Sequence, residues 1–191
     1  MIKTLKAAQE IAGKMSISNS KMPGSTFPTS TTKCPTGQKL AKVPGSVCHQ
    51  CYATRIEKIR PNVAAGWLKN WTKTMRTLAS DPAQWVEASA YQINHYHKRT
   101  GELCHRWFDG GDLENKAMLQ SIVDVAKATP DFKHWLPTKE KKLIRAYLKN
   151  NTLPDNLVVR VSSAMIDQGP YAGFRNTSTV HRDQDPVGHA C

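Results

Sequence analysis

The chain has 191 residues and a formal net charge of +12, and 39% of its residues are hydrophobic, which is typical of one soluble globular domain. No apolar run approaches the roughly 20 residues of a membrane span, so no transmembrane helix is predicted. Residues 1–6 lack a signal-peptide core, so we expect a cytoplasmic protein whose five cysteines serve metal binding or catalysis rather than disulfides.

The positive charge is concentrated in the first part of the chain. Residues 1–80 contain 13 lysine and arginine residues but only Glu10 and Glu57 as acidic residues, whereas residues 81–191 are nearly neutral. A basic surface attracts polyanions, so we expect nucleic acid or a nucleotide to contact residues 1–80. A solvated basic face that only aids solubility explains the same charge.

The amino-terminal half is predicted to be mostly helical around one loop-rich segment. Apolar residues at helical spacing predict a first helix over residues 2–14. Residues 16–31 are rich in Ser, Thr, Pro and Gly but carry spaced apolar side chains, which indicates a short strand leading into a cysteine-rich metal loop at 32–53. Two more helices are predicted, over residues 64–79 and from Pro82 to Gly101.

From Leu103 onward, strands and helices alternate. The expected order is strand 103–108, helix 114–128, strand 133–136, helix 139–148 and strand 157–161. The strand spacing of roughly 25–30 residues matches one βα unit of a parallel fold. The predicted fold class is therefore α/β, a partial (β/α) barrel or an open, mostly parallel sheet. Residues 1–166 are expected to form this single domain and 167–191 an irregular tail.

Polar and small residues follow each of the three predicted strands. They are Asp109-Gly110-Gly111-Asp112 after the first strand, Thr138-Lys139 after the second and Ser162-Ser163 after the third. Because ligands bind at the carboxyl ends of parallel strands, we expect these residues to form one pocket rim. Arg160, late in the third strand, is a candidate contact for a carboxylate or phosphate. Ordinary turn chemistry explains each motif taken alone.

The cysteines provide the candidate metal site. Cys48 and Cys51 lie two residues apart on a turn, and Cys34 lies within loop reach, so the three thiolates can bind one metal centre and leave one position open. A closed zinc site would take a fourth ligand, for which the candidates are His181, His189 and Cys191. Cys104 lies in a predicted strand and is expected to be a buried core thiol.

Taken in order, these motifs resemble a group of phage-associated proteins that are themselves similar to radical S-adenosylmethionine (SAM) enzymes. The resemblance covers residues 16–166 and rests on Cys51-Tyr52-Ala53, Gly110-Gly111-Asp112, Thr138-Lys139 and the Arg-x-Ser-Ser that begins at Arg160. It implies a partial (β/α) barrel that carries a [4Fe–4S] cluster on three cysteines. The open iron would then bind the amino and carboxylate groups of SAM.

The resemblance also implies roles for individual residues. Cys34, Cys48 and Cys51 take the cluster role. Gly110, Gly111 and Asp112 match a turn whose backbone meets the SAM amino group, and Arg160 and Ser162 match carboxylate or ribose contacts. The chain departs from the usual Cys-x3-Cys-x2-Cys spacing because 13 residues separate its first two cysteines, and Asp replaces Glu in the turn. In the similar phage proteins we expect further cysteines beyond the position of Cys191, which would then be the first of a C-terminal set that truncation has removed from this chain.

Two functions remain open at this point. The first is a radical-SAM-like enzyme that acts on a nucleotide, a nucleic acid or a protein. The second is a zinc-stabilised accessory protein that binds nucleic acid without catalysis, and in its plainest form the metal only stabilises the fold. The enzyme hypothesis requires the cysteine loop and the Gly110-Gly111 turn to face one cavity, with Arg160 and Ser162 opening onto it.

Overall fold

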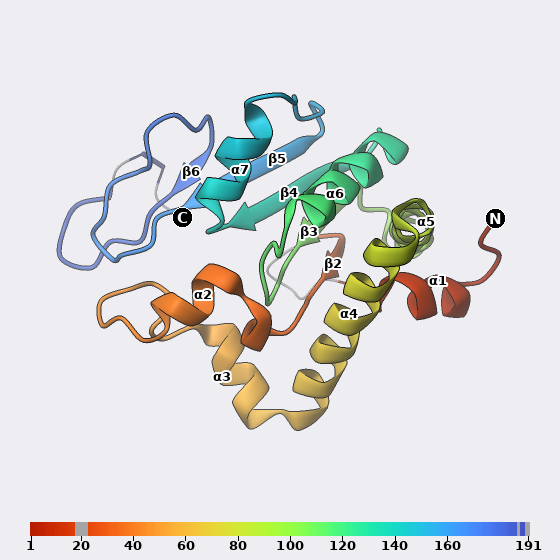
Figure 1. Cartoon of the computed structure of the whole chain (residues 1–191), viewed down its shortest axis with the longest axis horizontal. Coiled ribbons are helices and arrows are strands. Elements are labelled where there is room, and N and C mark those ends of the chain that lie inside the picture. The colour runs from red at the N-terminus through yellow and green to blue at the C-terminus, as the bar shows by residue number, and fades with distance from the viewer. Residues whose placement is uncertain (18–22, 187, 190–191) are drawn as a thin grey trace.

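The structure, a computed structural model, describes residues 1–17, 23–186 and 188–189. A six-stranded sheet with strand order β1-β2-β3-β4-β5-β6 forms its centre (Figure 1). The strands are β1 (Ser16–Ile17), β2 (Ser25–Phe27), β3 (Cys104–Trp107), β4 (Lys133–Thr138), β5 (Leu157–Ser162) and β6 (Thr177–Ser178). Only β1 and β2 are antiparallel. The predicted α/β class is confirmed, and the sheet is open rather than closed into a barrel.

Five helices pack on and beside the sheet and confirm the predicted helices, with ends that differ by a few residues. They are α1 (Leu5–Ala12), α4 (Pro61–Ser80), α5 (Pro82–Thr100), α6 (Lys116–Ala128) and α7 (Lys141–Leu148). Figure 1 shows α6 and α7 lying against β4 and β5. Within the described ranges, none of the helices is long and apolar enough to cross a bilayer.

Short helices that the sequence did not predict lie within the expected cysteine-rich loop and directly after it. They are the 3-10 helix η1 (Thr31–Lys33), α2 (Pro35–Leu40) and α3 (Tyr52–Ile59). Pro35 occupies the first position of α2, where its fixed backbone angle and missing N–H are tolerated. The tail beyond residue 166 is likewise not wholly irregular, because β6 pairs in parallel with β5.

Alternate residues of the strands point into the helical layer and form the core. Trp107, Leu136 and Val161, from β3, β4 and β5, are almost completely buried. The Trp107 ring stacks on Trp85 of α5 at a centroid distance of 5.9 Å and meets Phe27 of β2 edge-on at 6.0 Å. This aromatic cluster fixes the helical layer on one face of the sheet, which we call the covered face.

Two histidines are buried on the covered face. His105 shares a 2.8 Å hydrogen bond with Ser25 Oγ, and His134 Nε2 lies 2.9 Å from Thr129 Oγ1. The Thr129 hydroxyl donates its proton to the carbonyl of Val125, so it accepts from His134. Burial lowers the pKa of His134 to about 4 and lowers the pKa of His105 well below 6.5. Both imidazoles are therefore neutral in the folded protein at neutral pH.

Candidate functional site

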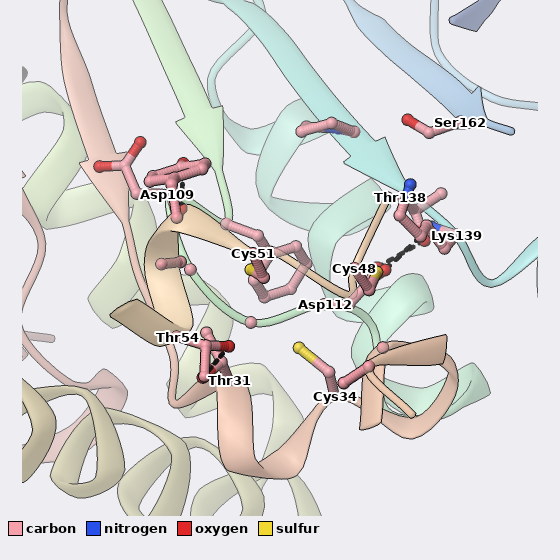
Figure 2. Close-up of a pocket in the computed structure, with 18 of the residues that line it drawn as sticks. Thr31, Cys34, Cys48, Cys51, Thr54, Asp109, Asp112, Thr138, Lys139 and Ser162 are labelled. Carbon is pink, nitrogen blue, oxygen red and sulfur yellow. Dashed lines mark hydrogen bonds between the residues drawn. The ribbon is translucent and has the colours of Figure 1, made fainter. Parts of the chain in front are cut away.

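A cavity of about 170 Å³ lies at the carboxyl ends of the parallel strands (Figure 2). Its walls come from η1, α2, the start of α3, the turn after β3 and the ends of β4 and β5. Cys34, Cys48 and Cys51 line this cavity together with Gly110 and Gly111. The expectation that the cysteines and the glycine turn face one cavity is therefore confirmed.

The three cysteines reach the cavity from two separate segments. Cys34 follows η1 directly, whereas Cys48 and Cys51 precede α3, and all three are half-buried free thiols. Gly37 keeps the space between them open. A Cβ at that position would lie 2.8 Å from the Cβ of Cys34, 3.6 Å from its sulfur and 4.0 Å from the sulfur of Cys48. Two of the sulfurs thus border the same small volume beside Gly37.

Burial keeps two of these thiols protonated in the protein on its own. It raises the pKa of Cys34 well above its ordinary value, and the negative charge of Asp112 adds to the effect. Burial also raises the pKa of Cys48, although the nearby positive charge of Lys139 opposes the shift. A bound cation would have to displace these protons, so metal binding at this site releases protons and strengthens as pH rises.

The three thiols all line the cavity. Among the described residues, no three His, Cys, Asp or Glu side chains lie close enough together to hold one metal ion. The chemistry of the donor set, three cysteine thiols, fits the ligands that iron–sulfur clusters take.

Close packing explains both glycines of the turn after β3. A Cβ at Gly111, whose φ is +86°, would lie 1.8 Å from Thr29 Oγ1, and a Cβ at Gly110 would lie 2.4 Å from the ring of Trp67. The amide of Thr29 donates a 2.9 Å hydrogen bond to the carbonyl of Gly110. The turn is thus held against the segment after β2, and its backbone borders the cavity.

Asp112 joins this turn to the end of β4. Its carboxylate accepts hydrogen bonds from the Leu113 amide (2.7 Å), the Thr138 hydroxyl (2.6 Å) and the Lys139 amide (2.9 Å). Burial raises the pKa of Asp112 to about 6, although the three bonds oppose the shift. The side chain therefore orders the strand ends, and Asn115 rather than Asp112 caps α6.

Of the remaining predicted site residues, the structure places Ser162 at the cavity and the others elsewhere or outside the described residues. Ser162 lines the cavity, but Arg160 is not among its lining residues. The Arg160 guanidinium donates instead to the carbonyl of Thr177, at 2.8 Å. Neither His181 nor His189 lines the cavity, and Cys191 lies outside the described residues. Cys104 is also absent from the lining, and it is half-buried rather than a core thiol as expected.

A buried carboxylate that the sequence analysis missed ties the cysteine segments together. Glu57 of α3, only 8% exposed, accepts hydrogen bonds from the Thr31 amide at 3.0 Å and from the Thr31 hydroxyl. Gln38 of α2 donates to the carbonyl of Thr31 at 2.7 Å, and Thr54 donates to its hydroxyl at 3.1 Å. Thr31 therefore anchors η1, and with it Cys34, to the helix that follows Cys51. The only signal in the sequence is an acidic residue in a basic segment.

A sequence model of the gene product 88 family matches residues 2–190. The chain belongs to the gene product 88 family. The match spans almost the whole chain, so the sheet and the cavity described above both lie within the family region. Membership confirms the phage-type part of the resemblance. A search of curated proteins and a search of solved structures each found no match.

Proposed function

We propose that this gene product 88 protein holds a [4Fe–4S] cluster on Cys34, Cys48 and Cys51 and accepts SAM in the adjoining cavity. One observation carries the proposal: three free thiols from two segments, and the glycine turn after β3, border a single cavity at the carboxyl ends of parallel strands. Three protein ligands would leave one iron of the cluster open to a small molecule. When bound, such a cluster supplies an electron from an external reductant.

In this proposal, the chain's own residues bind SAM and orient it in the cavity. The backbone of Gly110 and Gly111 borders the cavity and can accept from an amino group, and Ser162, at the carboxyl end of β5, offers a hydroxyl to the same cavity. Phe108 and Pro137 contribute apolar wall, which excludes water from the space. The substrate would be a nucleotide, a nucleic acid or a protein that enters beside these residues.

Anaerobic purification followed by metal analysis tests the proposal. The loaded protein is expected to be brown, with broad absorption near about 400 nm, and to contain about four iron atoms per chain. SAM titrated into the loaded protein should bind, whereas SAM titrated into the metal-free protein should bind at least tenfold more weakly. Colourless protein with one equivalent of zinc would overturn the cluster.

A zinc-stabilised accessory protein that binds nucleic acid is the second candidate. It is favoured by how the two acidic residues of the basic segment are used: Glu57 is buried against Thr31, and Glu10 pairs with Lys73 at 2.8 Å. The charged groups that remain free in residues 1–80 are therefore almost all cationic. This candidate predicts zinc in the purified protein and binding to nucleic acid that weakens steeply as salt rises.

A further inference from the structure

The face of the sheet opposite the helices is only partly covered. Side chains of β3, β4 and β5 alternate between buried positions on the covered face and exposed or half-buried positions on the other, which we call the open face. Arg106, Trp135 and Val158 stand in one register row across the three strands. Parallel sheets are usually covered on both faces, so this face has room for a partner.

The charge of the open face has one sign. Eight residues of the three strands point to this face, and three of them are cationic and none acidic: Cys104, Arg106, Lys133, Trp135, Pro137, Val158, Arg160 and Ser162. Asp109, just beyond β3, pairs with Arg106 at 3.3 Å, so these two charges cancel and Lys133 and Arg160 supply the net positive charge. A partner that covers this face is therefore expected to be anionic.

An aromatic platform lies in the middle of these cations. The Arg106 guanidinium carbon lies 4.9 Å from the centre of the Trp135 ring, and its Nη2 donates to the Tyr52 hydroxyl at 3.5 Å. Val158, 37% exposed, adds apolar surface beside Trp135. Flat aromatic and guanidinium groups on a sheet face suit unpaired bases, which stack on them, whereas the bases of a duplex stack on each other.

The open face runs directly into the cavity. Arg106, Pro137 and Ser162 point to the open face and also line the cavity that holds the three cysteines. Tyr52 joins the two regions, because its hydroxyl donates to the carbonyl of Asp109 at 2.6 Å and the residue itself follows Cys51. A ligand that lies across the open face would therefore reach the cavity at the carboxyl ends of β3, β4 and β5.

We propose that the open face binds a single-stranded nucleic acid, with a base stacked at Trp135 and Arg106 and phosphates near Lys133 and Arg160. Arg160 keeps part of its guanidinium for this contact, because the bond to Thr177 involves only Nη1. The assignment names the substrate of the proposed function, and it rests on that function only for what happens in the cavity. Binding itself depends on the open face alone.

Fluorescence anisotropy with a labelled single strand of about 12 nucleotides tests this assignment. Trp135→Ala should weaken binding about tenfold and Trp135→Phe less than threefold, because phenylalanine keeps a stacking surface. Lys133→Glu should weaken binding at low salt and reduce the salt slope by about 1 to 2. Lys142→Glu, the same charge change at an exposed site on α7, is the matched control and should bind as the wild type does.

Three results would overturn the assignment. They are unchanged affinity in both Trp135→Ala and Lys133→Glu, a duplex or an acidic peptide that binds as tightly as the single strand, or loss of binding only in Lys58→Glu on α3. Circular dichroism checks that each variant is folded. If Trp135→Ala is unfolded, the affinity of Lys133→Glu, a change at an exposed site, decides whether the open face binds the single strand. The measurements use both metal-free and metal-loaded protein. A zinc protein that keeps the Trp135 dependence would overturn the cluster and leave this assignment standing.

Discussion

The covered face of the sheet and the carboxyl-end edge of the same strands differ in what their residues do. On the covered face, Trp107 and Leu136 are completely buried and packed against helices. At the edge, half-buried thiols and two closely packed glycines border a cavity. Because the core residues lie along the strands and the cavity residues lie at or just beyond their carboxyl ends, the same strands supply both the core and a binding surface. Changes on the covered face should therefore affect stability, and changes at the edge should affect binding.

Replacing Trp107 by alanine is the largest change expected. The ring is fully buried between Trp85 and Phe27, and its loss should lower the free energy of unfolding by about 3–5 kcal/mol. Trp135→Ala, on the open face of the neighbouring strand, should cost less than half as much. Urea unfolding followed by circular dichroism measures both. Equal losses would remove the distinction between the two faces.

The cysteine variants at the carboxyl-end edge should show the opposite result, a large loss of metal binding with a small loss of stability. Cys34→Ala, Cys48→Ala and Cys51→Ala should each lose bound metal, while the metal-free variants unfold within about 1 kcal/mol of the wild type, a small change for half-buried sites. Cys104→Ala, outside the cavity lining, is the control and should keep its metal. Metal content is measured by elemental analysis after purification without oxygen. Metal loss in Cys104→Ala as complete as in Cys51→Ala would contradict this division of the cysteines.

Glu57 should have an intermediate effect, because it acts on the cysteines through Thr31. Glu57→Ala leaves the buried Thr31 amide without its acceptor, so metal affinity should fall about 10–100-fold. Glu57→Gln retains an oxygen that can accept from the same amide, and should lose less than tenfold. Competition with a chelator measures both affinities. Equal losses in the two variants would show that the charge of Glu57, rather than its hydrogen bond, matters.

The buried histidines predict a smaller, pH-dependent effect. Below about pH 6.5 the unfolded chain binds protons on His105 and His134 that the folded protein does not, so stability is lost as pH falls from 6.5 toward 4. Each histidine contributes about 1.4 kcal/mol per pH unit. Asp112 acts with the opposite sign between about pH 4 and 6, because its pKa is raised in the folded state, and it offsets about one histidine.

Urea midpoints of metal-free protein at pH 7, 6 and 5 measure the net slope, which should be roughly 1 kcal/mol per pH unit below pH 6. His134→Gln should flatten this slope, since glutamine can still donate to Thr129 but does not titrate. A midpoint that stays constant from pH 7 to 5 would mean that the two imidazoles are not held neutral on the covered face.

The long periodic segments could be predicted from the sequence because their periodicity extends over many residues. Helix α5 is an example: it spans Pro82–Thr100, within one residue of the predicted bounds, and Asp81 caps it by accepting from the Gln84 amide. The short helices α2 and α3 were not predicted, and the six residues of α2 carry little periodic signal. Pro35 directly after Cys34 was the available start signal for α2.

The candidate site was predictable as a set of strand ends but not residue by residue. Strand direction alone brings Gly110, Gly111 and Ser162 to one edge, and the structure confirms that arrangement. Arg160 has the same face as Ser162 but lies two residues farther from the edge, where it meets β6. Short β6 has no pattern that would have predicted this contact. The Glu57–Thr31 contact depends on tertiary packing, which the sequence pattern does not encode.

The contact between Thr29 and Gly110 joins segments about eighty residues apart in the chain, and closing so long a loop costs entropy before the contact forms. Local helices such as α4 and α5 have no such barrier and fold early. We therefore expect the cavity to be among the last parts of the protein to assemble. A ligand that enters it would then bind after β2 and β3 have paired, and its binding energy is expected to slow unfolding rather than to speed folding. In the cell, maturation of the site would follow completion of the chain.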